Sequence, residues 1–387
     1  MRTSRLSFCL QASAAAAALL SPRADSLSDK ECDVFLTNGS NSGYYTDHAF
    51  WDFRSLSDYA SVPDVVTDYS KVSQASVASK YFSSDTWTST WEIQGWNNTK
   101  DGGEKLNGDA TLKMVNSPSN VYIQENDDKT ADSDTYLTMR TKRLPGFQSA
   151  AEFESTEQYQ FLSVRMLARA IGSPGAIAAL FTYRDPSGEL AKVQEADIEI
   201  LTRDPRNKIS YTNQPSYTDD GDELPEATKN ASLPAGALWS NWLVHRLDWT
   251  PEASLWYVDG TEVARIEFQT PIDGAQVILN AWSDGGSWSG KMPVHDEAYL
   301  QIQWLEMVYN KSSSDDGEKR KRRRDTAVAN GGLMRRQEGE SGVVCSIDDT
   351  MEVGKAVEVK EDGGAAAMKW SWLASITTLG WLAVTML

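Results

Sequence analysis

The sequence contains few of the residues that metal sites and nucleic-acid surfaces require. It has three His and three Cys in 387 residues and no cluster of the two, so nothing supports a catalytic zinc site. Lys and Arg number 37 against 55 Asp and Glu, for a formal net charge of −18. Because nucleic-acid binding requires basic side chains to neutralise phosphates, this balance argues against such a partner. We expect no cofactor, with a structural calcium ion left open because carboxylates bind hard cations.

The basic residues that are present are concentrated in one segment. Eight of them lie between Lys319 and Arg336, where the only acid is Asp325. The rest of the chain carries 29 basic and 54 acidic side chains, a balance of −25. Aromatic residues are abundant, with 14 Trp, 14 Tyr and 10 Phe, and 40% of the residues are hydrophobic. This composition suffices for a core and excludes wholesale disorder.

Long apolar runs occur at the two ends of the chain. Near the N-terminus, two arginines precede an apolar run from Leu6 to Leu20, and small residues follow with Ala24 as a cleavage point. A charged stretch followed by an apolar run too short to span a bilayer is typical of a signal peptide. We therefore assign residues 1–24 to a signal peptide and expect a secreted protein.

The C-terminal residues 365–387 are mainly apolar, and small residues at 363–367 lead into them. This pattern is typical of a glycosylphosphatidylinositol (GPI) attachment signal. The alternative is a single-pass anchor, which usually leaves basic residues on the cytosolic side. We expect residues 365–387 to be the GPI signal, and the protein to be a monomer held by a lipid anchor at the cell surface, on the plasma membrane or cell wall.

The cysteines and the glycosylation sequons agree with export. Once Cys9 is removed with the signal peptide, Cys32 and Cys345 remain, and an even pair in an oxidising compartment is expected to form a disulfide. Asn-X-Ser/Thr sequons, the acceptor sites for N-glycosylation, occur at Asn38, Asn97, Asn230 and Asn310.

From residue 25 to residue 310 the pattern predicts an all-β domain. Short runs rich in β-branched and aromatic residues, such as 135–140, 161–166 and 302–307, alternate with Gly, Asp, Asn and Pro turns. Asp259-Gly260 between two such runs predicts a tight hairpin. Long helical periodicity is absent from this region, so many strands at regular spacing indicate a sandwich of two sheets.

Residues 311–364, which include Cys345, have the composition of a basic and polar linker. The run 319–324 would suggest nuclear localisation in a cytosolic protein, and the signal peptide argues against that interpretation. Two alternatives remain open. The run is either a site for a protease that cleaves at paired basic residues or a solvated, charged tether.

The most informative stretch of the domain runs from Gln194 to Leu201. Side chains alternate faces along a strand, so Glu195, Asp197 and Glu199 share one face while the apolar residues between them point to the other. Such an array suits glycoside hydrolysis with retention, in which one carboxylate attacks the anomeric carbon and another protonates the leaving oxygen. The alternatives are a solvated acidic strand edge and part of a calcium site.

Glu-X-Asp-X-Glu on a strand of a secreted, aromatic-rich β protein resembles the signature of glycoside hydrolase family 16. The resemblance extends over roughly residues 80–310. It includes the strand 209–213, the stretch from His245 to Pro251 that leads into Tyr257-Val258-Asp259-Gly260, and the segments 278–283 and 288–290. The resemblance implies a concanavalin A-like β-jelly-roll sandwich of two antiparallel sheets, with a cleft across the concave sheet.

Matched to the family motif, Glu195 is the expected nucleophile, Asp197 its assistant and Glu199 the general acid/base. Ala196 stands where the family usually has a larger aliphatic residue, and it is expected to face the core. The region 33–80 is the least covered by the resemblance.

Aromatic side chains are expected to bind the apolar faces of sugars. Trp282 and Trp288, from the segments that resemble the family's cleft wall, are the first candidates for substrate-binding platforms, and Tyr211 and Asn213 are further candidates. Trp249, Trp256 and Trp304 lie in regular strand patterns and are expected in the core. His245 is expected to be structural, because the carboxylates already supply acid and base. The acidic run 219–223 lacks EF-hand spacing and is expected to be an exposed turn.

The sequence thus predicts a retaining glycosidase that acts on cell-wall β-glucan, of the endo-β-1,3 or β-1,3(4)-glucanase type. A transglycosylase that uses the same site on glucan or chitin is the alternative within enzymes. A carbohydrate-binding lectin without turnover is the alternative outside them, although a lectin does not need all three carboxylates.

Overall fold

The computed structural model describes residues 26–100, 103–127, 132–185, 193–218, 220–312, 342–350 and 352–359. The predicted signal peptide, the basic run 319–324 and the predicted GPI signal lie outside these ranges. Within them, no helix is long and apolar enough to cross a membrane.

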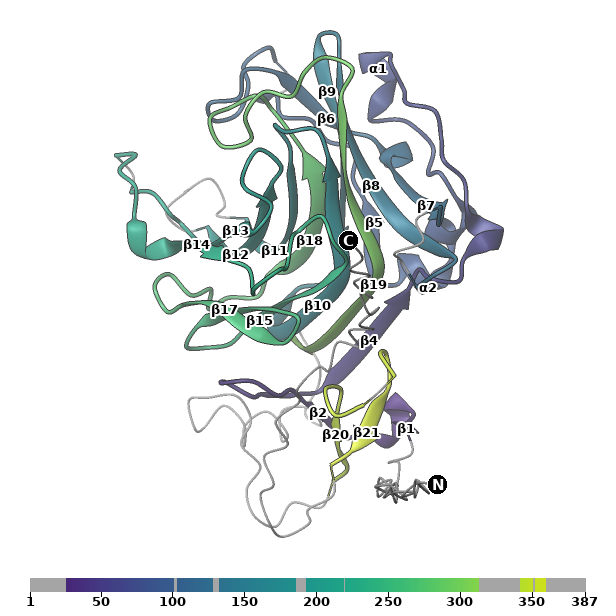
Figure 1. Ribbon diagram of the computed structural model, residues 1–387, viewed down its shortest axis with the longest axis vertical. Coiled ribbons are helices and arrows are strands. Elements are labelled where there is room, and N and C mark those ends of the chain that lie inside the picture. The colour runs from purple at the N-terminus through teal and green to yellow at the C-terminus, as the bar shows by residue number, and fades with distance from the viewer. Residues whose placement is uncertain are drawn as a thin grey trace, which may run out of the picture.

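Two sheets pack face to face and form a jelly-roll sandwich (Figure 1), which confirms the predicted fold. We call the first the front sheet. Its order is β14 (Thr228–Ser232), β13 (Lys208–Gln214), β12 (Gln194–Leu201), β11 (Ile177–Arg184), β18 (Gln276–Trp282), β9 (Phe147–Ser155) and β5 (Trp91–Ile93).

The second, or back, sheet has the order β7 (Val121–Glu125), β8 (Thr135–Leu144), β19 (Glu297–Lys311), β10 (Tyr159–Gly172), β15 (Leu243–Trp249), β16 (Ser254–Val258) and β17 (Thr261–Ile266). In addition, β4 (Asp47–Asp52) pairs with β19, and β6 (Lys113–Asn116) pairs with β9 in parallel, whereas the other pairs of the two sheets are antiparallel. Strand β9 also pairs with β8 and so joins the two sheets at one side.

The hydrophobic core fills the space between the two sheets. Trp249 and Trp256 are fully buried in this core, which confirms their predicted place. Trp304 is also nearly buried, but it has the parity of Glu306 and packs beside Phe50 on the outer face of the back sheet, so its predicted place in the core is wrong. The hairpin between β16 and β17 turns at Asp259 and Gly260, both with positive φ (46° and 74°), as a two-residue hairpin turn requires. Asp-Gly satisfies this requirement at low cost, because glycine adopts positive φ freely and Asp tolerates it.

The region 33–80, for which the sequence suggested no role, covers the side of the sandwich and begins a third sheet. Its short helices are η2 (Ser57–Tyr59), α1 (Tyr69–Val72) and η3 (Lys80–Ser83), and α2 (Asp85–Thr88) follows. Phe53 from this region joins the core and packs against Tyr81 and Trp87, and Trp87 in turn contacts Phe153 of β9. Two further 3-10 turns, Pro118–Asn120 and Pro225–Ala227, precede β7 and β14.

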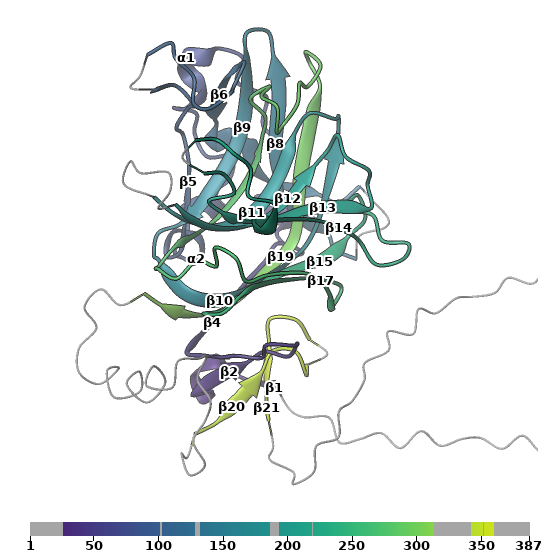
Figure 2. The same ribbon diagram turned by 90° about the vertical axis from the view of Figure 1, so that its left-hand side faces the viewer.

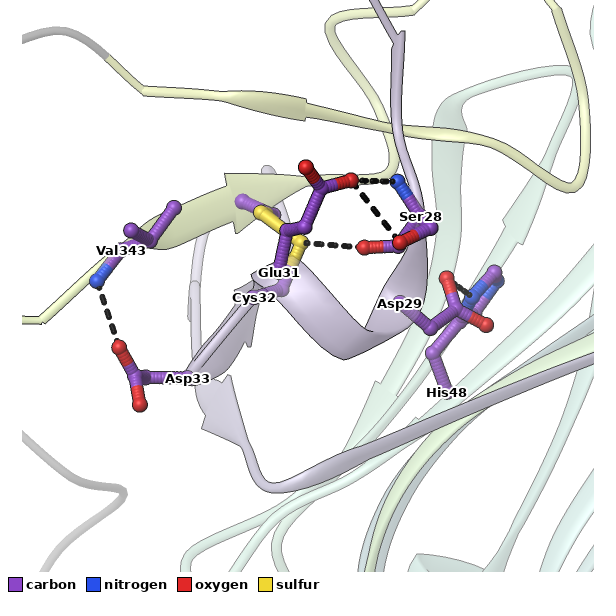
Figure 3. The surroundings of a disulfide bond; sticks show 8 residues. Ser28, Asp29, Glu31, Cys32, Asp33, His48 and Val343 are labelled. Carbon is purple, nitrogen blue, oxygen red and sulfur yellow. Dashed lines mark hydrogen bonds and ion pairs between the residues drawn. A yellow bond between two sulfur atoms is a disulfide. The ribbon is translucent and has the colours of Figure 1, made fainter.

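A small five-stranded sheet packs on the outer face of the back sheet. Its order is β1 (Ser26–Leu27), β21 (Ala356–Glu358), β20 (Val344–Ser346), β2 (Val34–Leu36) and β3 (Tyr44–Tyr45), with a 3-10 turn at Asp29–Glu31. In Figure 2 it lies below β10 and β4, on the side away from β11 to β14. The predicted Cys32–Cys345 disulfide is present in this sheet and links β20 to the segment before β2 (Figure 3).

The small sheet departs from the predicted domain boundaries. Residues 311–364 have the composition of a linker, yet β19 continues to Lys311, and β20 and β21 pair with β2 and β1. The physical reason is that Cys345, Ile347 and Ala356 bury their side chains against Phe35 and Val308, which makes these short strands part of the folded body.

Charged side chains attach the small sheet to the back sheet. Arg165 of β10 donates to Glu306 of β19 (2.7 Å). It also forms an ion pair of 2.5 Å with Asp348, a residue that follows β20. His48 of β4 lies 2.9 Å from both Glu306 and Asp29. Most of these groups are buried, so removing any one of them would leave a buried charge without its partner. The network therefore favours one position of the small sheet on the back sheet.

Candidate active site

The three acidic side chains of β12 lie on the outer face of the front sheet, as the alternation predicted. Ala196, Ile198 and Ile200 point the other way and are 0–1% exposed in the core. Asp197 is 2% exposed, whereas Glu195 and Glu199 are partly exposed. We call the outer face of the front sheet the carboxylate face.

Strand β12 is an interior strand of this sheet, which excludes a solvated strand edge. On one side Tyr183, Phe181 and Ala179 of β11 pair with Glu195, Asp197 and Glu199 in that order. On the other side Gln214, Thr212 and Ser210 of β13 pair with the same three acids. Because partners in an antiparallel pair share a face, the floor around the carboxylates consists of these six side chains.

Burial and mutual repulsion make the three carboxyl groups hold their protons more tightly than usual. Burial raises the pKa of Glu199 to about 7, although a hydrogen bond from Trp288 opposes this change. Burial, with the nearby charges of Glu195 and Glu199, raises the pKa of Asp197 well above its ordinary value. Burial also raises the pKa of Glu195 to about 7. The site can therefore keep a protonated carboxylic acid beside a carboxylate near neutral pH.

Trp288 contacts one of the three acids directly. Its indole Nε1 donates a 3.0 Å hydrogen bond to Oε1 of Glu199, and 37% of its surface is exposed. The sequence predicted Trp288 on this side of the molecule, and the structure places it against the predicted acid/base.

The loop that carries Trp288 is held by a neighbouring segment. The backbone N–H of Thr111 donates to the carbonyl of Asp284 (3.0 Å), its hydroxyl donates to the carbonyl of Gly285 (2.9 Å), and the N–H of Ser287 donates to Asp109 (2.8 Å). Gly285 has φ +72°, and a Cβ there would lie 2.6 Å from the Thr111 hydroxyl. Only glycine fits this close approach without displacing the loop.

Trp282 also lies on the carboxylate face. It ends β18 and pairs with Ile177 of β11, which pairs in turn with Leu201 of β12. Its ring packs on these two residues and stays partly exposed. An apolar surface therefore continues the floor beyond Glu199, at the position predicted for a sugar platform.

Tyr211 and Asn213 do not lie on the carboxylate face, and their predicted contact with substrate is wrong. Tyr211 pairs with Ile198, is 1% exposed and stacks against Trp256 in the core. Asn213 pairs with Ala196, is fully buried and donates to the carbonyl of Phe268 (3.0 Å). Both point inward because they share the parity of Ile209, and the intervening Ser210 and Thr212 face outward instead.

The structure adds a polar cluster that the sequence analysis did not single out. Glu152 of β9 accepts hydrogen bonds from Nε1 of Trp96 (2.5 Å) and from Nδ2 of Asn280 (3.3 Å). Glu152 is 5% exposed, and burial raises its pKa to about 7 despite these two donors. Trp96 is 45% exposed. The sequence 150–154 does contain a pattern that indicates these residues, because two glutamates alternate with apolar residues as on a strand with one open face.

Glu152 belongs to the same cross-strand row as Glu199. Asn280 pairs with both Glu152 and Ala179, and Ala179 pairs with Glu199. Three strand spacings of ~4.8 Å separate the two acids, so the row extends ~14 Å across the sheet.

The remaining predictions concern metals and histidine. No group of three or more His, Cys, Asp or Glu within the described ranges is placed to hold a metal ion. The acidic run near Gly221 forms a turn, in which the N–H of Asp222 donates to the hydroxyl of Thr218 (3.1 Å). His245 is fully buried in β15, where burial lowers its pKa to about 4, which confirms a structural residue remote from the carboxylates.

Comparisons with known proteins cover the same region. The family model described as glycosyl hydrolases family 16 matches residues 111–306, just over half of the chain. A xylanase/beta-glucanase of Ruminococcus flavefaciens is 24% identical over 237 residues, which are 61% of this chain and 26% of that protein. A beta-glucanase of Bacillus amyloliquefaciens is 26% identical over 152 residues, which are 39% of this chain and 59% of that protein.

The chain thus spans less than two thirds of the length of these relatives. Among solved structures, a prokaryotic beta-1,3-1,4-glucanase (lichenase) derived from a mouse hindgut metagenome aligns with a TM-score of 0.43 and 19% identity, over 68% of this chain and 99% of that one. Because the family model covers more than half of the sequence, including all three carboxylates of β12, the chain belongs to glycosyl hydrolases family 16.

Proposed function

We propose that this protein is a retaining endo-glycosidase that hydrolyses β-glucan, with linkages of the β-1,3 or β-1,3(4) type. The observation that carries the proposal is the set of three carboxyl groups on one face of an interior strand, with Glu199 hydrogen-bonded to Trp288. Membership of the family and the names of the matched relatives, which are beta-glucanases, support the substrate class.

In the first step Glu195 attacks the anomeric carbon while Glu199 donates its proton to the leaving oxygen. Glu195 and Glu199 are four residues apart on β12, so their Cα atoms lie ~13 Å apart. A retaining pair needs carboxyl groups ~5 Å apart, so the mechanism requires the two side chains to lean toward each other over the scissile bond. A Glu199 with its pKa near 7 holds the required proton at mildly acidic pH.

In the second step Glu199, now ionised, removes a proton from water, and the water displaces Glu195 from the anomeric carbon. The hydrogen bond from Trp288 stabilises the ionised Glu199 in this half of the cycle. Asp197 lies between the two. Burial and the charges of Glu195 and Glu199 raise its pKa, which favours the protonated form that can donate to Glu195 when that residue carries negative charge.

The floor of the site suits a neutral polysaccharide. Trp282, Trp288 and Trp96 offer partly exposed rings for the apolar faces of sugars. Glu152 and Asn280 add hydrogen-bonding groups for sugar hydroxyls in the same row as Glu199. The acidic surroundings would repel a polyanion.

The proposal is tested by incubating the purified protein with laminarin, lichenan and chitin oligosaccharides and following product size and anomeric configuration. We expect shorter β-configured glucan products. Longer products formed by transfer to a sugar acceptor would identify a transglycosylase, and binding without turnover would identify a lectin. Glu195→Gln should abolish turnover, whereas the exposed Glu125 of the back sheet offers a matched control, Glu125→Gln, that should retain it.

We also propose that the protein is exported and held by a GPI anchor, as in a fungal-type cell-surface enzyme of the plasma membrane or cell wall. The N-terminal pattern, the small residues before the C-terminal apolar run and the Cys32–Cys345 disulfide support this proposal. Phosphatidylinositol-specific phospholipase C should move the protein from the detergent phase to the aqueous phase. Persistence in the detergent phase would contradict the lipid anchor.

A further inference from the structure

One glycosylation sequon lies on the carboxylate face. Asn230 is in β14, which is the edge strand of the front sheet, and it pairs with Ser210 of β13. Ser210 pairs in turn with Glu199. Because paired residues share a face, the side chain of Asn230 points to the same side as the predicted acid/base, while its neighbour Ala231 packs toward the core.

Asn230 therefore ends a row that crosses the carboxylate face from β9 to β14. The row begins at Glu152, continues through Asn280 and Ala179 to Glu199, and reaches Asn230 by way of Ser210. Two strand spacings place the Asn230 backbone ~10 Å from that of Glu199, on the side opposite to Trp96.

The floor between Glu199 and Asn230 consists of small side chains with hydroxyl groups. Ser210 is 3% exposed, and its hydroxyl has no hydrogen-bond partner among the described residues. The hydroxyls of Thr212 and Thr228 in the adjacent row lie 3.1 Å apart. A sugar chain that continues past Glu199 toward β14 would lie over these groups. It would then contact the Asn230 side chain and any group attached to it.

Asn230 is also available for modification. It is exposed, and Ala231 and Ser232 complete a sequon without proline. Asn38 and Asn310, in contrast, use Oδ1 to accept hydrogen bonds from Arg246 (3.1 Å) and from the N–H of Thr46 (3.1 Å), and these contacts lie on the side of the small sheet.

We propose that Asn230 carries an N-linked glycan that limits how far a glucan chain extends over β14. This inference rests on the proposed function and on export. In the modification, a bond forms between Nδ2 of Asn230 and C1 of an oligosaccharide, and the C1–O bond to a lipid pyrophosphate donor breaks. The amide loses one proton and the lipid pyrophosphate leaves. The bulk of the glycan then occupies the β14 end of the carboxylate face.

Occupancy is measured first and needs no enzyme activity. The full chain is expressed in a eukaryotic secretory host, and the peptide that contains Asn230 is analysed by mass spectrometry before and after peptide N-glycosidase digestion in 18O water. We expect a glycopeptide that is converted to an 18O-labelled Asp. An unmodified Asn230 in the secreted protein would overturn the inference, whatever the activity of the enzyme.

The effect on substrate is measured with β-glucan oligosaccharides of increasing length. Removing the sequon in two independent ways, Asn230→Gln and Ser232→Ala, should raise kcat/KM on long chains at least severalfold relative to short ones. Asn310→Gln is the matched control, since it removes a sequon on the other side and should leave the profile unchanged. The three variants should match wild type when all are made in a bacterial host without N-glycosylation.

An unchanged length profile in both sequon variants, with Asn230 occupied in wild type, would overturn the limiting role of the glycan. If the protein does not hydrolyse glucan, the proposed function fails separately. The same variants are then compared by affinity electrophoresis in gels that contain long or short glucans. Equal retardation of the glycosylated and unglycosylated forms would overturn the inference in that case.

Discussion

Nε1 of Trp288 lies 3.0 Å from Oε1 of Glu199, so a residue of the 283–290 loop influences the pKa of a residue on β12. A hydrogen bond donated to a carboxylate stabilises its ionised form and lowers its pKa. Burial has the opposite and larger effect, and the pKa of Glu199 is raised to about 7. The pKa of Glu199, the proposed acid/base, therefore reflects two opposing influences, its burial on β12 and the hydrogen bond from Trp288.

Replacing Trp288 by Phe should move the alkaline limb of the pH–rate profile to higher pH. Without the indole N–H the ionised Glu199 is less stable, so its proton is held to a higher pH. A charge-assisted hydrogen bond contributes ~1.5–3 kcal/mol, and the partial exposure of Trp288 reduces its effect to about one pH unit. The measurement is kcat/KM against pH, with Trp282→Phe as the control. An equal shift in both variants would contradict a specific role for Trp288.

Replacing Glu199 by Gln should affect substrates according to their leaving group. Glucan needs a proton on the departing oxygen, so we expect its turnover to fall about 10²–10⁴-fold. A dinitrophenyl glycoside leaves without protonation, so the burst of dinitrophenol from the first step should survive. In Glu195→Gln both should be lost. A burst in Glu195→Gln and none in Glu199→Gln would show that the two roles are reversed.

The corrected face assignment predicts opposite results for two aromatic residues. Trp282→Ala removes an exposed ring from the floor and should raise KM for glucan about tenfold, since such ring contacts contribute 1 kcal/mol or more. Tyr211→Phe should leave KM unchanged, because the ring faces the core and its buried hydroxyl lacks a partner among the described residues. Steady-state kinetics and thermal unfolding of both variants check this prediction. A change in KM for Tyr211→Phe with no change in Tm would indicate that Tyr211 contacts the substrate after all.

His48 should make folding stability depend on pH in the alkaline range. Burial disfavours the imidazolium, but hydrogen bonds to Asp29 and Glu306 outweigh it and raise its pKa to about 9. A raised pKa gives stability that is complete below the unfolded value near 6.5 and is lost as pH rises through 9. The contribution is about 3 kcal/mol at most. Denaturant unfolding between pH 6 and 10 should show this decline, and His48→Gln should flatten it, whereas an unchanged slope in the variant would exclude His48 as the cause.

Removing the disulfide should loosen the small sheet and spare the active site. The Cys32–Cys345 bridge closes a loop of 313 residues, and loss of a native disulfide typically costs about 2–5 kcal/mol. In Cys32→Ser/Cys345→Ser we expect a lower unfolding midpoint and faster proteolysis within 342–359. Turnover of glucan at low temperature should persist, because the carboxylates lie on the other sheet. Reduction of the wild-type protein should reproduce both effects. Loss of turnover without unfolding would show that the two faces are coupled.

Much of the fold and the centre of the site could be predicted because local patterns determine them. Three acids that alternate with Ala196, Ile198 and Ile200 require a strand with one buried and one open face, and the structure has this strand. Asp259-Gly260 similarly determines a hairpin through backbone conformation alone. In both places the information lies within a few consecutive residues.

Proximity to the site along the sequence does not determine which face of a strand a side chain occupies, whereas parity does. Tyr211 lies on the strand beside the carboxylates, but it shares the parity of the apolar Ile209 and therefore points into the core. Glu152 and Trp96 are not recognisable as neighbours from local sequence patterns. Fifty-six positions separate them in sequence, and only the pairing of β5 and β18 with β9 brings their neighbourhoods together. The pairing of β20 with β2 depends on a comparable long-range contact, which linker-like composition conceals.

The small sheet determines how the molecule can be held. Strands β1 and β21 are paired neighbours on the outer face of the back sheet, so the described chain begins and finishes on the side away from Glu195 and Glu199. An attachment that continues from either strand, whether to a membrane or to a solid support, is therefore joined to the molecule on the side of the back sheet. A protein immobilised in this way presents its carboxylates outward, toward a polymer too large to diffuse to it.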